Sequence, residues 1–482
     1  MASGQTQRSD SGSARGPDGA SGQDSPANRL TRPRRGGVLA VMCVGMFLVQ
    51  LDVTVVNVAL PDIRAGLGTG LAGQQWVVDA YAVVLASLLL VGGTVGDRYG
   101  PKRVVLTGMG LFGAASLACG LAPNVVTLIA GRAVQGLGAA LLLPGTLAVI
   151  TRTYPERTEQ ARAVGVWAGV SALALPAGPL LGGALVAGLG WQAVFLINLP
   201  VIAIAAPATM RLLTESRDQM PRPLDLPGGA LAAVTLGAAV FAVINLERGA
   251  GSPLVWVAAT VAALALGGFV AREHTAPDPM LPLPLLRSPA FTGANIVAGA
   301  MNLVGIGTVF VATLYLQTVQ HHTALVAGVM LLPLFVPLAA LAPLTGRLTA
   351  RFGPRLPMSI GLVLGAAGSL AMIGLTPTSS YLRFLPVLLG LGLGMGLLTA
   401  AVVAAAVRSV PSDRSGLASG VNNTARQTAG ALAVALYGLL AGSPTQPDQY
   451  TSGLHPLGVL GGAVWLAALA LTWATIKPTN TT

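Results

Sequence analysis

The chain has 482 residues, of which 53% are hydrophobic and only 9% are charged. Soluble domains carry about 25% charged residues, so this composition excludes an ordinary soluble protein and indicates one that crosses a membrane several times. The formal net charge of +11 could suggest binding to nucleic acid, but the basic residues lie in short loops between apolar runs. The positive-inside rule explains that placement, and we expect no nucleic-acid partner.

The apolar runs are about 20 residues long, which suits spanning helices better than the shorter strands of a β-barrel. We therefore expect an all-α polytopic protein of the cytoplasmic (inner) membrane with fourteen transmembrane helices. Residues 1–35 are polar and predict a disordered cytoplasmic tail, and residues 477–482 form a second, short cytoplasmic tail. The expected spans lie near residues 37–60, 73–95, 103–121, 125–149, 162–186, 193–213, 226–246, 254–271, 290–316, 323–345, 357–376, 384–407, 415–440 and 457–476.

Arg and Lys cluster in alternate loops, which puts both termini in the cytoplasm. A weak internal repeat joins the loop Gly96–Val104 (GDRYGPKRV) to the loop Gly346–Leu356 (GRLTARFGPRL). Internal repeats are typical of secondary transporters built from two related halves. We expect a six-helix bundle over residues 36–213, a two-helix insert over 214–289, and a second six-helix bundle over 290–476. This is a 6+2+6 plan.

Two acidic residues lie well inside the expected spans, Asp52 in the first and Asp79 in the second. A carboxylate near the middle of a bilayer costs about 2.5–3.5 kcal/mol on insertion scales, so it usually faces a cavity, finds a partner or takes up a proton. At 1.5 Å per residue both lie within roughly 8–14 Å of the outer membrane surface, so they could share one outward-facing proton-binding cavity. Alternatively, Asp52 makes a structural hydrogen bond, and Asp79 is solvated or attracts a cationic substrate.

Four stretches of the first half follow one another in a characteristic order. They are LDVTVVNVALP (51–61), GTVGDRYGPKR (93–103), LIAGRAVQGLGAA (128–140) and GPLLGG (178–183). The ordered set resembles the major facilitator superfamily, in its fourteen-helix drug:proton antiporter branch. In the second half, residues 272–295 and SGVNNTARQTAG (419–430) look most like bacterial antibiotic exporters of the methylenomycin A resistance type. The resemblance implies the major facilitator fold and proton-coupled drug export.

The resemblance also implies roles for particular residues. Arg132, which does not readily lose its proton, would couple proton release at the first-helix acid to conformational change; a structural clamp between helices is the alternative. The loop after the second helix would latch the two halves together, although its bases alone also fit a solvated loop. The loop residues concerned are Gly93, Asp97, Arg98, Gly100 and Arg103.

Small residues and a proline form one face of the expected fifth helix. They are Gly178, Pro179, Gly182 and Gly183, and they resemble the motif associated with antiporters. Because small residues let helices approach closely, ordinary packing is one interpretation. The other is a hinge and seal that prevents leakage.

The sequence contains no GxxxxGK[ST] phosphate loop and no zinc-ligand spacing, so we expect neither an enzyme nor an ATP-driven pump. We expect no cofactor, metal or obligate protein partner; protons, lipids and a small drug-like substrate are the expected partners. The favoured function is efflux of a small hydrophobic or amphipathic toxic compound driven by the proton gradient, and the alternative is transport of a small metabolite. The residues expected to line a substrate cavity are Asn57, Trp76, Tyr81, Gln135, Trp167 and Asn423.

Overall fold

The computed structural model describes residues 32–214, 225–246, 249, 251–277, 279–281, 283–411 and 415–477. The predicted tails therefore lie outside the described residues, except for residues 32–35 and 477. Every regular element in the described part of the chain is a helix.

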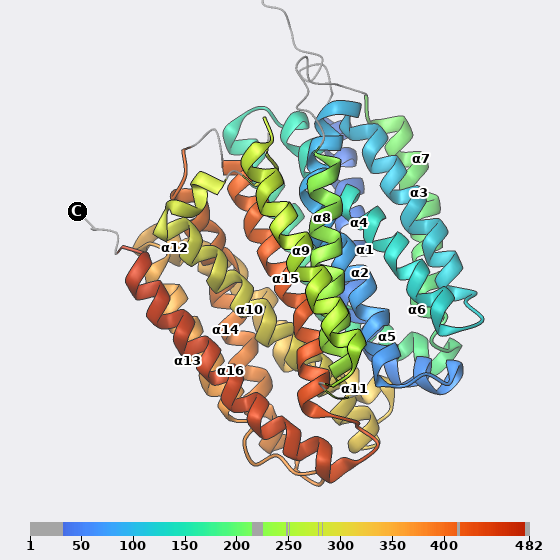
Figure 1. Ribbon diagram of the computed structural model, residues 1–482. Helices are drawn as coiled ribbons and strands as arrows, with labels where there is room; N and C mark the ends of the chain where they lie inside the picture. Colours follow the sequence, from blue (N-terminus) through green and yellow to red (C-terminus); the bar gives the residue numbers. More distant parts are fainter. Residues whose placement is uncertain are drawn as a thin grey trace, which may run out of the picture.

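Seven helices lie in the part of the chain predicted as the N-terminal half of the bundle (Figure 1). They are α1 (Arg32–Leu67), α2 (Leu71–Tyr99), α3 (Pro101–Gly120), α4 (Val125–Thr153), α5 (Arg157–Leu189), α6 (Ala193–Leu196) and α7 (Asn198–Leu212). The helix is interrupted at Ile197, between the short α6 and α7. These two helices together make one segment that is long enough to span a membrane. The Asn124 side chain caps α4 by accepting a hydrogen bond from the Thr127 N–H at 2.9 Å.

The parts predicted as a two-helix insert and a C-terminal half follow, and we keep these names for them. The insert consists of α8 (Leu226–Asn245) and α9 (Pro253–Thr275), and a linker containing the 3₁₀-helix η3 (Leu283–Arg287) leads out of it. The C-terminal half consists of α10 (Pro289–Leu314), the π-helix η4 (Tyr315–Val319), α11 (Ala324–Met330), α12 (Leu332–Phe352), α13 (Arg355–Leu370), α14 (Tyr381–Arg408), α15 (Ser415–Ala441) and α16 (Pro447–Thr475).

Eleven segments of the described chain are long and apolar enough to cross a membrane, or twelve if the pair α11 and α12, bent by 43°, is one span. The helices α13 and α15 are not among them. The helix α13 has only 16 residues, and α15 carries Asn422, Asn423, Arg426 and Gln427 in its middle. Both nevertheless pack against long helices of the bundle, α13 against α14 and α16, and α15 against α10 and α2. Fourteen spans remain a prediction.

The insert lies against both halves of the bundle. The helices α8 and α9 pack side by side, and α8 also contacts α2 of the N-terminal half and α15 of the C-terminal half. Apolar side chains join these three helices, among them Val83, Val240 and Ala435. We call the side of the bundle on which α1 begins and α16 ends the near end, uppermost in Figure 1, and the opposite side the far end.

Candidate functional site

A buried ion pair joins the middle of α1 to α4. The Arg132 Nη1 donates a hydrogen bond to Asp52 Oδ2, and each residue is only 1% exposed. An isolated charge at this depth would be costly, so each residue supplies the counter-charge that the other requires. The structure thus brings together two of the three residues predicted for proton coupling.

Further contacts fix the Arg132 guanidinium. Its Nε donates to the Val77 carbonyl of α2 at 2.9 Å, and its Nη1 also donates to Gln135 Oε1 at 2.9 Å. The Arg132 Cζ lies 4.4 Å from the centre of the Tyr81 ring, a cation–π contact. Arg132 therefore contacts α1, α2 and its own helix, and the buried Tyr81 and Gln135 are part of this centre.

Gln135 extends the polar centre to two more helices. Its Nε2 donates to Ser116 Oγ of α3 at 2.8 Å and lies 3.4 Å from Asp52 Oδ1. The same Ser116 Oγ accepts a hydrogen bond from Asn198 Nδ2 of α7 at 3.1 Å. Ser116 and Asn198 were not predicted; the only signal in the sequence was a polar residue inside an apolar run.

Asp79 lies apart from this centre. It is 0% exposed, and neither carboxylate oxygen has a hydrogen-bond partner within the described residues. At about 100° per residue, Asp79 is turned about 200° around α2 from Val77 and Tyr81, which face Arg132. Its own side of the helix carries Trp76, which packs against Phe241 of α8 with ring centroids 6.2 Å apart. The structure therefore does not join Asp79 to Asp52 and Arg132.

The predicted small-residue face of α5 makes two close helix contacts. On one side, Gly178 and Gly182 touch α1: a β-carbon on Gly182 would lie 3.0 Å from the Val55 carbonyl oxygen, and one on Gly178 would overlap Thr54. On the other side, a β-carbon on Gly183 would lie 2.5 Å from the Leu325 Cα of α11.

Pro179 takes part in the same contact between the halves, because a β-carbon on Gly328 of α11 would overlap its carbonyl oxygen. The helix α5 thus touches its own half and the opposite half without side chains between the backbones. Small residues permit this packing, which brings the two halves into contact toward the far end.

Two glutamines add hydrogen bonds between the halves at the far end. Gln75 Nε2 of α2 donates to the carbonyls of Val434 and Ala435 in α15, at 3.3 and 3.2 Å. Gln317 Nε2 of η4 donates to the Val58 carbonyl of α1 at 2.9 Å. Neither contact is predictable from the sequence, because an amide in a membrane helix does not reveal its partner.

The loop predicted to act as a latch is a tight turn between α2 and α3. Gly100 has φ 94°, a left-handed conformation that suits glycine, and its N–H donates to the Gly96 carbonyl at 3.1 Å. Arg98 is exposed and stacks on Tyr99, with Cζ 5.8 Å from the ring centre. The Asp97 side chain lies outside the described part of the chain. Gly93, near the end of α2, is half-buried.

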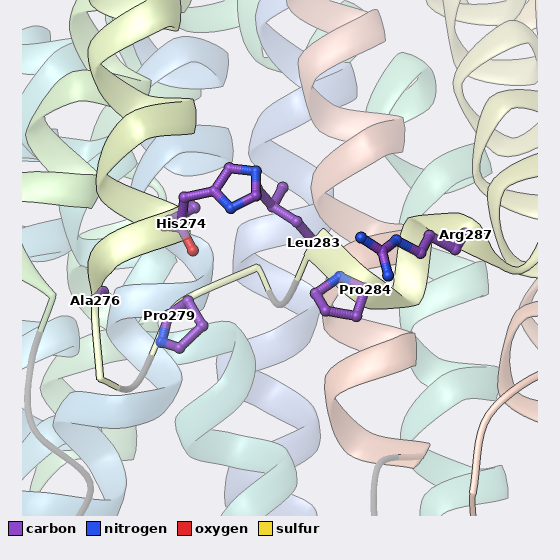
Figure 2. Close-up of a pocket in the computed structure, with 7 residues that line it drawn as sticks. His274, Ala276, Pro279, Leu283, Pro284 and Arg287 are labelled. Carbon is purple, nitrogen blue, oxygen red and sulfur yellow. The ribbon is translucent and has the colours of Figure 1, made fainter.

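Two cavities border the near end. One, of about 280 Å³, lies where α2 meets α3 and is lined partly by Arg103 and Tyr99. The other, of about 540 Å³, lies between the end of α9 and η3, and is lined partly by His274 and Arg287 (Figure 2). Neither cavity includes a residue predicted to bind substrate.

The remaining predicted cavity residues are dispersed. Asn57 Nδ2 donates to the Val53 carbonyl of its own helix at 2.8 Å, and Trp167 Nε1 donates to Thr146 Oγ1 at 3.3 Å. Asn423 is half-buried in α15. Within the described ranges, no three His, Cys, Asp or Glu side chains come together to hold a metal ion.

The amino-acid sequence matches a known family and several named relatives. A family model described as Major Facilitator Superfamily matches residues 42–434. A methylenomycin A resistance protein of Streptomyces coelicolor is 36% identical over 440 residues, which cover 89% of this chain and 91% of that protein. A tetracenomycin C resistance and export protein of Streptomyces glaucescens is 34% identical over 443 residues, 90% of this chain and 81% of that protein.

Solved structures agree on the fold. The peptide transporter POT in complex with sulfate matches with a TM-score of 0.68 at 15% identity, covering 91% of this chain and 94% of that one. A bacterial homologue of the human lysosomal transporter Spinster, inward-facing and unoccupied, matches with a TM-score of 0.65 at 18% identity, covering 92% and 98%. The protein is a multi-pass helical transporter of the bacterial inner membrane and not an enzyme. The chain belongs to the major facilitator superfamily.

Proposed function

We propose that the chain exports a small hydrophobic or amphipathic toxic compound from the cytoplasm in exchange for protons. The Asp52–Arg132 ion pair carries this proposal, because it puts an acid that can bind a proton against a base that does not readily release one. The names of the relatives, which refer to resistance and export, support a drug-like substrate.

The membrane arrangement belongs to the same proposal. We assign fourteen spans in a 6+2+6 plan, with α13 and α15 also crossing the membrane and the near end facing the cytoplasm. Both termini are then cytoplasmic. The contacts of α13 and α15 with long apolar helices support this assignment.

Protonation of Asp52 would act first on the link between α1 and α4. A neutral carboxyl group attracts Arg132 less strongly, while the Val77 carbonyl and Gln135 still hold the guanidinium. The helix α1 is then free to shift relative to α4. Because α1 packs against α5, and α5 closes the far end against α11, the shift reaches the contact between the two halves.

The cycle follows from this coupling. With the far end closed, Asp52 is ionised, Arg132 holds it, and the substrate enters from the near end. Proton uptake from the far end accompanies release of the substrate there, as the halves rock about a site near the membrane midplane. The membrane potential supplies about 2.3 kcal/mol per charge per 100 mV. Asp79 provides a second acid, either for protons or for a cationic group on the substrate.

The test is efflux of a fluorescent compound measured in everted vesicles, with and without an uncoupler. The uncoupler should abolish efflux by the wild-type chain, and Asp52→Asn should lose gradient-driven efflux while it still exchanges substrate without a gradient. Glu159→Gln is the matched control, because Glu159 pairs with Arg35 at 3.2 Å, far from Asp52 in the fold. Uncoupler-resistant efflux, with full activity in Asp52→Asn, would reject the proposal and favour a facilitative transporter.

A further inference from the structure

Two buried carboxylates meet at the near end of the insert. Asp225 precedes α8 and caps it, and Glu273 lies in the last turn of α9. Asp225 is 6% exposed and Glu273 is 3% exposed. The proposed transport cycle uses neither residue.

One oxygen of each carboxylate accepts hydrogen bonds. Asp225 Oδ1 accepts hydrogen bonds from the Gly228 N–H at 3.1 Å and from Arg272 Nε at 3.0 Å. Glu273 Oε2 accepts a hydrogen bond from the Leu281 N–H at 2.8 Å. These bonds fix the orientation of both carboxylates.

The other two oxygens are buried and have no hydrogen-bond partner within the described residues. They converge on one point: a β-carbon on Gly228 would lie 2.6 Å from Asp225 Oδ2 and 3.1 Å from Glu273 Oε1. Glycine at position 228 leaves that space open. Two unpartnered acceptors that face one space require a donor between them, because a buried oxygen without a hydrogen bond is costly.

We propose that Asp225 and Glu273 share one proton and form a proton-binding site at the near end of the insert. The O–H group of one carboxyl donates to the unpartnered oxygen of the other. Two ionised carboxylates whose oxygens both lie within 3.1 Å of one point would repel each other, as in other paired acids. With one shared proton, the charges of Asp225, Glu273 and Arg272 sum to zero.

Among the described residues, few other charged side chains lie beside this pair. Arg272 is hydrogen-bonded to Asp225. The helix α2 covers this end of α8 with apolar side chains: Val91 Cγ2 lies 2.8 Å from the place of a β-carbon on Gly229. Glu273 also lines the cavity of about 540 Å³, together with His274 and Arg287. Figure 2 shows His274 at the end of α9 and Arg287 on η3, on two sides of this cavity. Water that fills this cavity would give the proton a path to the near-end solution.

The shared proton would join three segments: the start of α8, the end of α9 and the linker that holds Leu281. The folded chain then keeps a proton that the unfolded chain releases at neutral pH, so stability should fall as the pH rises. When the proton leaves, two buried anions repel each other and this end of the insert loosens.

The experiment is thermal unfolding of the full-length chain in detergent over a series from neutral to alkaline pH, with Glu273→Gln as the main variant. The wild-type midpoint should shift downward as the pH rises. The Glu273→Gln midpoint should shift less, because its amide donates to Asp225 at every pH. The midpoint of the reciprocal variant Asp225→Asn should also shift less than that of the wild type. This variant provides the test if Glu273→Gln does not fold. A wild-type midpoint that does not fall, or variants that fall in parallel with it, would overturn the proposal.

Two further measurements exclude other causes. The unfolding midpoint of His274→Gln should fall with pH as in the wild type. A midpoint of this variant that no longer falls would assign the pH response to His274 instead. Replacing sodium by potassium at constant pH should leave the wild-type midpoint unchanged, and stabilisation by sodium would overturn the proton assignment. Infrared spectroscopy should show the carbonyl stretch of a protonated carboxyl group that is lost in both Glu273→Gln and Asp225→Asn; its persistence in both would contradict the shared proton.

Discussion

Gly183 of α5 and Leu325 of α11 meet backbone to backbone across the two halves of the transporter. A β-carbon at position 183 would lie 2.5 Å from the Leu325 Cα, closer than such atoms approach in proteins. In the proposed cycle this contact closes the far end, and the backbones can come this close only because residue 183 lacks a side chain.

Gly183→Ala should open this closure, because overpacking of this kind costs about 1–3 kcal/mol. The measurement is labelling by a membrane-impermeant thiol reagent of Val58→Cys, a buried position at the far end, after replacement of the buried Cys43 and Cys119. Labelling should be faster in Gly183→Ala and transport slower. Gly188→Ala on the same helix is the control, since no atom would contact its β-carbon. Equal labelling rates would show that the Gly183 contact does not hold the far end closed.

Asp52→Asn should destabilise the fold as well as impair coupling. It leaves the Arg132 guanidinium buried without a counter-charge, and breaking one side of a buried ion pair costs about 3–5 kcal/mol. Arg132→Gln should cost a similar amount, and the double variant should lose less than the sum of the two. Thermal unfolding of the purified variants measures this coupling. Strictly additive losses would mean that the ion pair contributes nothing to stability.

Asp79→Asn should have the opposite effect on stability. Because the Asp79 carboxylate is buried and has no hydrogen-bond partner within the described residues, an amide removes a charge that nothing compensates. The unfolding midpoint at alkaline pH should stay constant or rise. The change in stability caused by Asp79→Asn should add to that caused by Arg132→Gln, since Asp79 and Arg132 share no partner. A loss as large as that of Asp52→Asn would reveal a partner for Asp79.

Gln75→Met and Gln74→Met form a matched pair. Both side chains are 0% exposed; Gln74→Met loses one hydrogen bond and Gln75→Met loses two made by the same nitrogen, so the variants should lose about 1–2 kcal/mol of stability. Gln74 bonds to the Leu60 carbonyl within its own half at 3.0 Å, whereas Gln75 bonds to α15 of the other half. Only Gln75→Met should therefore speed labelling of Val58→Cys. Identical labelling in both variants would exclude a role for Gln75 in closing the far end.

The sequence by itself determined the class of protein, the approximate extent of most helices and the residues most costly to bury. Apolar runs of membrane length must become helices, because lipid offers no partners for backbone groups. A charged side chain inside such a run needs a counter-charge, so Asp52 and Arg132 were predictable partners once their depth was known. The small-residue face of α5 likewise predicted close packing, but not that α11 would be its partner in the opposite half.

Tertiary structure alone decided which neighbour each polar group meets. Periodicity along one helix cannot give its register against a helix far away in the sequence, and this register brings Ser116 and Asn198 to Gln135. The structure also separates Asp79 from Asp52. Asp79 lies on the side of α2 opposite to Val77 and Tyr81, which face Arg132. The convergence of Asp225 and Glu273 depends on the packing of α8 against α9, since hydrogen bonding is short-ranged and only the folded chain brings their oxygens to one point.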